Sequence, residues 1–577
     1  MINLDMARIF DEIADILEVK GENPFRIRAY RRAARTIETL TQDLKVIAER
    51  GGVSELKKIP GVGEGIAKKI VEIAHTGDCK KHGELTQEVP SGVLELLAIP
   101  RVGPKTIAKV HDELGITSIA ELEEAAQSHR LEGILGLGTK VEENILKGIG
   151  QYRSYKGRVL LSEALPRAEL IVTELKKLDV VDKIIIAGSL RRMRETIGDI
   201  DILVVSKRPM EVMDAFTCLD GVEDIVAKGD TKSSIVLRGV DVDLRVVAET
   251  SFGAAAHYFT GSKHHNIRIR ELGVKQGLKI NEYGIFRGDE RIGGDDEADV
   301  FESVGLAYIP PELREDRGEV EAAKENKIPE LVAANDIKGD LHVHTNWSDG
   351  KNSIEEMALT AISYGYEYIA VADHSPAVGI TGGMTEDKIT KRQEEIEKLN
   401  NRFEDESTNF KVLSASEVDI KSDFSMDFPD DVLKSLDVVV GAIHTKFSQD
   451  RATMTKRIVT AMENPNVDII AHPTGRLLGK RDPYEVDMGQ LMESARDTGT
   501  IMELNSFPSR LDLNDIHCKM AKDYGVLIAI STDAHDAMQM RNVIRYGVAT
   551  ARRGWLEPKD VVNTRGLGDI RGLLKGR

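Results

Sequence analysis

Two histidines lie two residues apart past the middle of the chain, in the stretch GDLHVHTNWSDG at residues 339–350. In an extended strand, side chains at positions i and i+2 point the same way, so His342 and His344 are predicted to face one layer while Leu341 and Val343 face the other. Two imidazoles aimed at one point suggest a metal site. A lone histidine on a strand is more often a hydrogen-bonded core or surface residue, so the pair alone is weak evidence.

The pattern recurs further along the chain. Four apolar runs end on a histidine or on Asp-x-His: YIAVADH at His374, VVVGAIH at His444, VDIIAH at His472, and VLIAISTDAH at Asp533 and His535. From about residue 338 to the end, apolar strands alternate with amphipathic helices, which predicts parallel β-α units. The ends of such strands lie at one edge, so we expect the histidines to gather there.

A second constellation consists of carboxylates. The stretch AGSLRRMRETIGDIDILVV places Asp199 and Asp201 on one face of a strand, and VDVDLRVV offers Asp243 on the expected neighbouring strand. Three such carboxylates can hold two Mg²⁺ ions, one activating a hydroxyl and one stabilising the leaving pyrophosphate. Gly188-Ser189 can open a helix toward a triphosphate, with Arg192 supplying charge. Asp-x-Asp alone is common on strand edges, but the full set predicts nucleotidyl transfer.

Composition limits the class of protein. The 577 residues are enough for several domains, and the formal net charge of −18 argues against a wholly basic nucleic-acid wrapper. No apolar stretch approaches the roughly 20 residues of a membrane helix, and the N-terminal segment does not resemble a signal peptide, so we expect a cytoplasmic protein. Cys79, Cys218 and Cys518 form no Cys-x-x-Cys pair, so metals must rely on histidines and carboxylates.

The first 150 residues are predicted to be all-helical. Segments 56–73, 96–116 and 131–149 resemble one another, each with a glycine turn followed by a helix, which is the helix-hairpin-helix pattern. Such a turn can bind a DNA phosphate without reading bases, although a single copy fits an ordinary turn equally well. Arg101 replaces a glycine in the second copy. The expected DNA contacts are Gly61, Gly63, Lys68, Lys69, Gly103, Lys105, Gly136 and Gly138.

An arginine-rich stretch precedes these hairpins. NPFRIRAYRRAARTI, at residues 23–37, holds five arginines, including Arg31, with Phe25 and Tyr30 between them. This composition suits phosphate contact combined with stacking on an unpaired base, and a solvated helix face explains it equally well.

The middle of the chain changes character. Strand-like runs fill residues 155–310, together with one expected helix over AAAHYFTGSKHHNIRIRELGVKQG at 254–277. The charged, proline-flanked stretch that follows, residues 310–339, is predicted to be a partly helical linker.

Residues 1–315 resemble the family X DNA polymerases, through the hairpin units, GSLRR…GDIDIL, VDLRVV, YFTGSKHHN and INEYGIFR. The resemblance implies that Asp199, Asp201 and Asp243 bind metal and catalyse. It also implies nucleotide contacts from Ser189, Arg192, Gly198, Arg158, Tyr258, Phe259, Gly261 and Asn266. Lys263 stands where the animal enzyme has an acidic residue. Lys69 matches the Schiff-base lysine of the family's 5'-deoxyribose phosphate lyase, but Arg26 replaces a pocket lysine and phosphate binding is the commoner role.

The third region resembles the polymerase and histidinol phosphatase (PHP) domain, whose barrel is a distorted seven-stranded one. The resemblance implies a 3'-5' exonuclease with two or three Mn²⁺ or Zn²⁺ ions, and related 3'-end or abasic-site cleavage. Arg476 is expected either to bind a substrate phosphate or to form a surface salt bridge. The metal ligands implied are His342, His344, Asp349, His374, Glu417, His444, His472, Asp533 and His535.

The sequence thus predicts a multidomain chain with an N-terminal all-α helix-hairpin-helix region, an α+β nucleotidyltransferase palm and a C-terminal α/β distorted (β/α)7 PHP barrel. The expected domains are 1–80 and 81–152 (helical), 153–250 (palm), 251–315 (nucleotide-binding), 316–337 (linker) and 338–577 (PHP).

We expect a monomeric repair polymerase that fills gaps in gapped or primer-template DNA with dNTPs and Mg²⁺, has no membrane partner, and trims 3' ends in its barrel. One alternative is a small-molecule or RNA nucleotidyltransferase joined to a histidinol-phosphatase-like enzyme. Another is a DNA-binding protein with an inactive regulatory barrel. The repeated hairpins weigh against the first alternative, and the complete ligand set weighs against the second.

Overall fold

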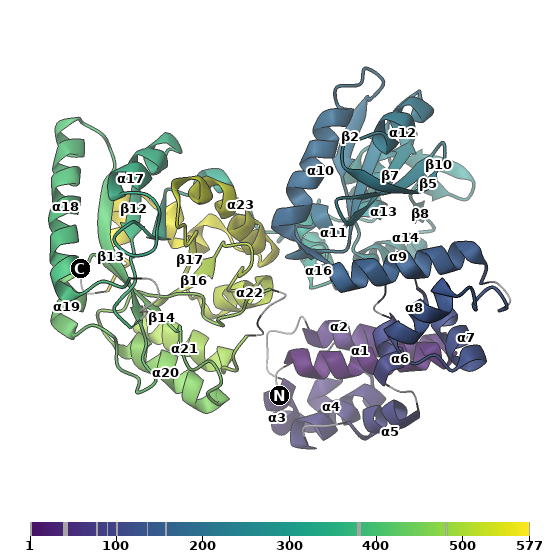
Figure 1. Cartoon of the computed structure of the whole chain (residues 1–577), viewed down its shortest axis with the longest axis horizontal. Helices are drawn as coiled ribbons and strands as arrows, with labels where there is room; N and C mark the ends of the chain where they lie inside the picture. Colours follow the sequence, from purple (N-terminus) through teal and green to yellow (C-terminus); the bar gives the residue numbers. More distant parts are fainter. Residues whose placement is uncertain are drawn as a thin grey trace. The chain divides into compact units, whose positions relative to one another are not determined.

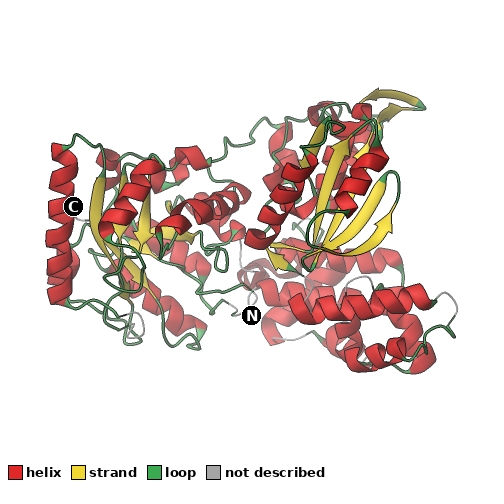
Figure 2. Ribbon diagram, turned by 45° about the horizontal axis from the view of Figure 1, so that its top comes forward, coloured by secondary structure: helices red, strands yellow, loops and turns green. Residues whose placement is uncertain are grey.

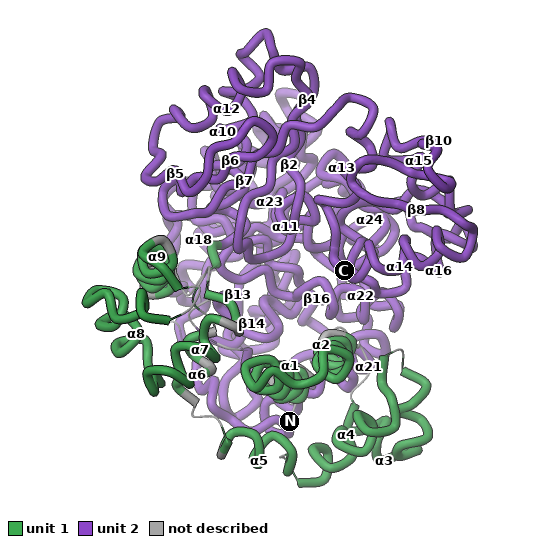
Figure 3. Tube along the Cα trace, turned by 90° about the vertical axis from the view of Figure 1, so that its right-hand side faces the viewer, with its two compact units in different colours: residues 1–159 green, residues 160–577 purple. Residues whose placement is uncertain are grey.

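The computed structural model describes most of the chain (Figures 1 and 2). The residues described are 3–38, 44–59, 61–76, 79–88, 91–97, 99, 102–134, 137–155, 158–377, 382–478, 481 and 483–575. They form two compact units, residues 1–159 and residues 160–577 (Figure 3). Among the described residues, every helix falls short of the length and apolarity needed to cross a membrane.

The first unit is built from helices around its own core, as predicted. Aliphatic side chains at helical spacing, such as Ile66 and Ile70 on α4, are buried in this core. Phe10 and Tyr30 stack between α1 and α2, with ring centroids 6.1 Å apart. The helices are α1 (Asn3–Val19), α2 (Pro24–Glu38), α3 (Leu44–Leu56), α4 (Glu64–Thr76), α5 (Lys80–Glu88), α6 (Ser91–Leu97), α7 (Pro104–Leu114), α8 (Ile119–Gln127) and α9 (Thr139–Tyr155).

The second unit begins with a mixed sheet of order β2-β4-β7-β6-β5, in which β4 and β7 are parallel and the other pairs are antiparallel. Alternation along β7 buries Val240, Val242, Leu244 and Val246 and leaves the aspartates on the other face. The elements up to this sheet's end are β1 (Val159–Leu160), α10 (Leu161–Leu175), β2 (Lys183–Ile186), α11 (Gly188–Arg191), β3 (Thr196–Ile197), β4 (Asp199–Val205), α12 (Pro209–Thr217), β5 (Val222–Lys228), β6 (Lys232–Leu237) and β7 (Val240–Val247).

The helix predicted over 254–277 is wrong as a single helix, because the structure has two. Gly261 ends α13 at φ +70°, a conformation that favours glycine, and the Ser262 side chain caps α14 by accepting the His265 N–H. A three-stranded sheet, β10-β9-β8, follows. The elements here are α13 (Phe252–Thr260), α14 (Lys263–Lys275), β8 (Lys279–Asn281), β9 (Gly284–Arg287), β10 (Glu290–Gly293) and α15 (Glu297–Glu302).

The stretch at 310–339 contains a short helix, α16 (Glu319–Lys324), as predicted, but it packs as part of the unit. Glu319 is fully buried and accepts hydrogen bonds from His265 Nδ1 at 2.8 Å and from the Asp316 and Arg317 backbone N–H groups. Burial raises the pKa of Glu319 to about 7. Charged residues therefore hold this segment in place, whereas the sequence suggested a partly helical linker.

Seven parallel strands in sequential order form a barrel, drawn in green to yellow in Figure 1. The barrel nearly closes where β11 meets β17, since His344 N donates to Ala534 O and Asp533 N donates to His342 O, both at 2.9 Å. Asn563 ties the same seam by donating to Gly339 O and Ile530 O. The strands are β11 (Gly339–Val343), β12 (Tyr368–Val371), β13 (Lys411–Asp419), β14 (Val438–Ala442), β15 (Ile469–Ile470), β16 (Ile501–Asn505) and β17 (Ile528–Ser531).

Helices cover the outside of this barrel. Alanines and larger apolar side chains, among them Tyr368, fill its inside together with Ile570 of the C-terminal helix α24. The expected placement of Leu341 and Val343 on one face is wrong. Leu341 packs in the inner cluster and Val343 in the outer one, because the pairing of β11 with β12 shifts register between Asp340 and Val343. The helices are α17 (Ile354–Ser363), α18 (Glu386–Asp405), α19 (Asp430–Ser435), α20 (Arg451–Glu463), α21 (Met488–Thr498), α22 (Asp515–Tyr524), α23 (Ala537–Arg553) and α24 (Leu567–Arg571).

Candidate active sites

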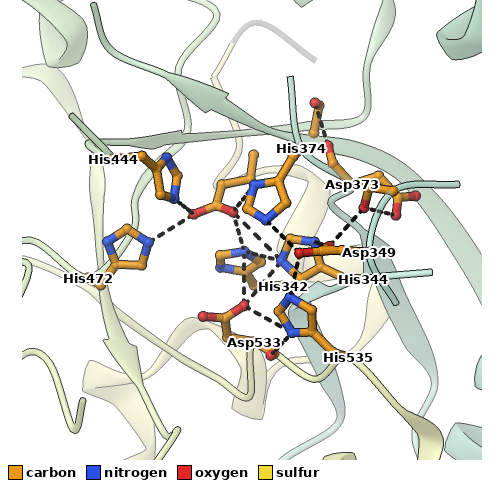
Figure 4. Close-up of polar contacts among 12 residues, drawn as sticks. His342, His344, Asp349, Asp373, His374, His444, His472, Asp533 and His535 are labelled. Carbon is orange, nitrogen blue, oxygen red and sulfur yellow. Dashed lines mark hydrogen bonds and ion pairs between the residues drawn. The ribbon is translucent and has the colours of Figure 1, made fainter. Parts of the chain in front are cut away.

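The first candidate site lies at the carboxyl ends of the barrel strands. The parallel strands end at one rim, so the histidines that follow the apolar runs converge there, as in other β/α barrels. Figure 4 shows His444 and His472 on one side of the cluster and Asp533 and His535 on another, with His342 and His344 between them. The structure brings together all nine residues implied as ligands: His342, His344, Asp349, His374, Glu417, His444, His472, Asp533 and His535.

Eight of the nine fall into three overlapping groups, each with ligand atoms within 4.8 Å of one another. His344 and His374 each belong to two of these groups. Such overlap suits metal ions that lie next to one another at the barrel rim. The Nε2 atoms of His342 and His344 are only 3.1 Å apart, and the buried Nδ1 of His344 has no hydrogen-bond partner among the described residues. A ring nitrogen with no proton acceptor deep in a polar cluster fits a metal ligand.

Glu417 links the groups. Its carboxylate lies 2.9 Å from His374 Nδ1, 3.2 Å from His444 Nε2 and 2.9 Å from His472 Nε2. Burial disfavours the charged imidazoles, but Glu417 and its neighbouring carboxylates outweigh it and raise the pKa of His374 to about 10 and that of His444 to about 9. Without metal, these imidazolium groups balance the carboxylates, so metal binding must release protons.

Residues behind the cluster, which the sequence reasoning missed, orient its ligands. Glu503 on β16 accepts a hydrogen bond from His342 Nδ1 at 2.7 Å and another from His472 N. Asp419 Oδ1 lies 3.2 Å from His444 Nδ1. A ring nitrogen held by a carboxylate leaves the other nitrogen for a metal. The available signal was a glutamate inside the apolar strand IMELN.

The contacts of Arg476 bear on its two expected roles, phosphate binding and a surface salt bridge. Its side chain is buried and pairs with Glu195, at 2.7 Å from Nη2 to Oε2, and it donates to the Arg510 and Leu511 carbonyls. The Arg476 side chain is thus buried and forms an ion pair between the barrel and the segment before the mixed sheet's strand β4, so it is not a surface salt bridge. Arg510 is the arginine nearer the cluster, with Nε 3.7 Å from Asp533 Oδ2.

The second candidate site lies on the mixed sheet. Asp201 on β4 is directly opposite Asp243 on β7, and Asp199 lies two residues before Asp201 on the same face. Burial and the charges of Asp199 and Asp243 raise the pKa of Asp201 to about 7. Asp243 is held by Lys232 Nζ at 2.6 Å and by the Ser234 hydroxyl. Three clustered carboxylates of which one resists ionisation are suited to divalent cations.

A pocket of about 470 Å³ adjoins these carboxylates. Asn266 donates through Nδ2 to Tyr258 O at 2.7 Å, and its buried Oδ1 has no partner among the described residues. An unsatisfied acceptor in a polar pocket is suited to a ligand donor. The lining residues are Gly188, Ser189, Arg192, Asp199, Asp201, Tyr258, Phe259, Thr260, Gly261, Lys263, Asn266 and Arg270.

Of the two neighbouring arginines Arg191 and Arg192, only Arg192 lines this pocket. Arg192 is almost fully buried and donates through Nη1 to Thr260 O at 2.5 Å and through Nε to Glu315 Oε1 at 3.0 Å. Arg191 is instead bound to Glu297 by two hydrogen bonds of 2.7 Å. Gly198 immediately precedes β4 and is not among the lining residues, and Arg158 belongs to the first unit. The nucleotide contacts of these two residues, and those of the six predicted contact residues that line the pocket, stay predictions.

Known proteins resemble both parts of the chain, the part with the mixed sheet and the barrel. Over 576 residues the chain is 40% identical to the DNA polymerase/3'-5' exonuclease PolX of Bacillus subtilis (strain 168), and the match covers 99% of both chains. The chain belongs to the PolX family. Residues 1–79 match a helix-hairpin-helix domain, 93–151 a SAM-like helix-hairpin-helix tandem, 255–315 the DNA polymerase beta thumb and 340–506 the PHP domain.

Two further relatives each match only part of this PolX-family chain. A probable phosphatase of Thermoanaerobacter sp. (strain X514) is 31% identical over 248 residues, which is 41% of this chain and 94% of the relative. DNA polymerase lambda of Rattus norvegicus is 25% identical over 345 residues, or 54% of this chain and 56% of the relative. The predicted family and fold class are confirmed.

The hairpins of the first unit share one geometry. Gly63, Gly103 and Gly138 each directly precede a helix, and the carbonyl of each accepts a helical N–H four residues on. A Cβ at any of the three would meet open space, so the turns lie open to a ligand. Gly61 has φ +83°, and a Cβ there would lie 2.8 Å from Cγ of the Arg32 side chain.

The basic side chains predicted to bind DNA differ in their surroundings. Arg31 pairs with Asp11, Asp15 and Glu18 of α1, so its charge is largely balanced within the unit. Lys68 pairs with Glu64 at 2.9 Å, and Lys69 donates to Gly65 O. Gly136 and Arg101 lie outside the described residues, as does the Lys105 side chain.

Proposed function

We propose that this PolX-family chain is a DNA-directed DNA polymerase that fills short gaps in damaged DNA, and that its barrel is a 3'-5' exonuclease. The observation that carries the proposal is the presence, in one chain, of two separate constellations suited to metals. One has three carboxylates beside a polar pocket, and the other has six imidazoles and three carboxylates at a barrel rim.

In the polymerase site, Asp199, Asp201 and Asp243 would hold two Mg²⁺ ions, whose bound charge lowers the pKa of the attacking hydroxyl and stabilises the leaving pyrophosphate. Ser189 and Arg192 bind the triphosphate, and Gly198 and Arg158 assist. Tyr258, Phe259, Gly261 and Asn266 contact the sugar and base. The role of the chain is to align the primer hydroxyl with the α-phosphate and to keep these donors in position.

In the barrel, the nine residues would hold two or three Mn²⁺ or Zn²⁺ ions, which supply an activated water and neutralise phosphoryl charge. Glu503 and Asp419 orient His342 and His444 for this task. Arg510, beside Asp533, binds the phosphodiester that approaches the rim. Related 3'-end and abasic-site phosphoesters are further substrates.

The helical part supplies the grip on DNA. We place it in two domains, 1–80 and 81–152, whose three hairpin turns bind backbone phosphates of gapped or primer-template DNA. The other domains are then the palm at 153–250, the nucleotide subdomain at 251–315, the linker at 316–337 and the PHP domain at 338–577. The protein acts as a monomer in the cytoplasm.

The polymerase proposal is tested against RNA-end and small-molecule nucleotidyl transfer. The wild type and Asp201→Asn are compared in three reactions. These are extension of a primer across a one-nucleotide gap, extension of an RNA 3' end, and nucleotidyl transfer to a sugar phosphate. We expect transfer to the gapped DNA alone, lost in Asp201→Asn. Equal or better transfer to RNA or to the sugar phosphate would refute it.

The exonuclease proposal is tested by metal removal. Chelator-treated protein should lose 3' shortening and regain it with Mn²⁺. The amount of metal that the chelator releases should be two or three ions per barrel. Shortening that persists in the chelated protein, or a barrel that binds metal but leaves every 3' end intact, would show that the barrel is not the exonuclease.

A further inference from the structure

A buried ionic network joins the last residue of the barrel helix α23 to the loop that carries Arg192. Arg553 ends α23, and its side chain is 5% exposed. Its Nη1 donates to the backbone carbonyl of Arg192 at 2.7 Å and to Glu315 Oε1 at 3.0 Å, and its Nη2 donates to Asp515 at 2.8 Å. One guanidinium fork therefore holds both the main chain of Arg192 and the carboxylate that binds the Arg192 side chain.

Glu315 is shared in the same way. Its carboxylate is 3% exposed and accepts from Arg192 Nε at 3.0 Å, and its second oxygen lies 3.5 Å from Arg194 Nη1. The Glu315 pKa stays far below its ordinary range, because the surrounding arginines outweigh the cost of burial. Both oxygens are thus fixed, and so is the direction in which Arg192 points.

The network carries more positive than negative charge. It contains the four guanidinium groups of Arg192, Arg194, Arg317 and Arg553 against the two carboxylates of Glu315 and Asp515. A largely buried cluster with two surplus positive charges is costly unless an anion approaches it. The part of the cluster that lines the nucleotide pocket is Arg192, so an anion bound in that pocket would relieve this surplus.

We propose that Arg553 and Glu315 are positioning residues of the polymerase reaction, which hold Arg192 in the orientation that binds the nucleotide triphosphate. The barrel then forms part of the nucleotide site in addition to carrying its own metal cluster. This inference rests on the proposed role of Arg192 as a triphosphate ligand.

Other contacts between barrel and polymerase part offer matched controls. Arg545, on the same helix as Arg553, pairs with Glu169 on α10 at 3.1 Å, and its side chain is 38% exposed. Arg552, the neighbour of Arg553, pairs with Glu312 at 2.8 Å. Neither partner lines the nucleotide pocket. Loss of these pairs removes packing between the two parts and leaves Arg192 held.

The test measures single-nucleotide incorporation into gapped DNA, with equilibrium binding of a dNTP in Ca²⁺ as a readout that needs no turnover. The variants are Arg553→Lys and Glu315→Gln, which keep volume, with Arg192→Ala as reference and Arg545→Ala as control. We expect KM and Kd for the dNTP to rise about tenfold in Arg553→Lys and Glu315→Gln, the effect of one charged hydrogen bond, and to stay within about twofold in Arg545→Ala. The 3' shortening activity should stay near wild type in all four, which shows that the barrel is folded.

Two results would overturn the inference, and they are distinguishable. If Arg192→Ala weakens dNTP binding but Arg553→Lys and Glu315→Gln do not, or if those two lower kcat with KM unchanged, positioning is wrong and the proposed function stands. If Arg192→Ala itself binds dNTP like the wild type, the triphosphate role of Arg192 is wrong, and the inference falls with it.

Discussion

At the scale of single residues, Gly188 shows how closely the polymerase site is built. Its φ is +64°, and a Cβ there would lie 2.2 Å from Asp201 Oδ2. Gly188→Ala therefore strains the backbone and also displaces the Asp201 carboxylate, which we propose to be catalytic. We expect extension to fall by about 100-fold or more, since misplacement of about 1 Å has such effects.

The matched control is Gly277→Ala. Gly277 has φ +72°, but a Cβ there meets nothing within 4 Å, so it tests strain without the clash. Primer extension by Gly277→Ala should stay within about twofold of wild type, as for a surface change with modest strain. Equal losses in the two variants would show that the contact with Asp201 is irrelevant.

Asp201 also predicts a pH dependence. Burial first, and then Asp199 and Asp243, raise its pKa to about 7, above the ordinary value of 3.8. The metal-free fold therefore favours protonated Asp201. The folding stability that comes from this proton is fully present below pH 3.8 and is lost as pH rises through about 7. Mg²⁺ must displace that proton. The Mg²⁺ concentration for half-maximal extension should therefore rise about tenfold per pH unit below about 7. A requirement unchanged between pH 7.5 and 5.5 would contradict the shifted pKa.

What the sequence could predict at this scale depended on whether a residue's role is visible in its neighbours along the chain. His444 and His472 end apolar strands and were predictable, because strand direction aims them at the rim. Glu503 was missed because its partner His342 is far away in sequence. The contacts of Arg31 and Arg476 likewise depend on carboxylates from other elements, which no local pattern reveals.

At the scale of elements, α18 is tied to the barrel through one buried ion pair. Arg392 and Asp373 are fully buried and 2.9 Å apart, and Asp373 also accepts from Thr345 N and Oγ1. Arg392→Leu leaves that carboxylate uncompensated and should cost about 3–5 kcal/mol of stability. The thermal unfolding of the barrel reports it.

The control lies on the same helix. Arg402 pairs with Glu355 at 2.6 Å, but both side chains are largely exposed, so Arg402→Leu should change stability by about 0–1 kcal/mol. Similar melting temperatures for both variants would mean that the buried pair does not stabilise the barrel.

Element types were predicted correctly and element breaks were missed. The strand-helix alternation after residue 338 follows from apolar runs and helical spacing, and the structure confirms it. The break between α13 and α14 did have a local signal, because Gly261 is typical of a helix end and Ser262 of a helix N-cap. The register shift in β11 is set by its neighbour β12, so GDLHV alone could not reveal it.

At the scale of the whole molecule, each unit has its own hydrophobic core. The core of the first unit is made of residues 6–149 alone, while other clusters fill residues 160–577. Residues 160–577 should therefore fold without the helical unit and hydrolyse a small phosphodiester at near wild-type rate. Their affinity for gapped DNA should fall at least about tenfold, with a weaker salt dependence, because hairpin phosphate contacts are lost. Unchanged affinity would exclude the hairpins as the DNA grip.

Two independent metal-dependent active sites in one chain should be separable by mutation. The most direct measurement follows a 5'-labelled primer across a one-nucleotide gap, with and without dNTPs, for the wild type, Asp199→Ala/Asp201→Ala and His342→Ala/His344→Ala. We expect the aspartate variant to lose extension and keep shortening, and the histidine variant to do the reverse, each loss being about 1,000-fold or more. Shortening that survives in the histidine variant, or extension that survives in the aspartate variant, would contradict this expectation.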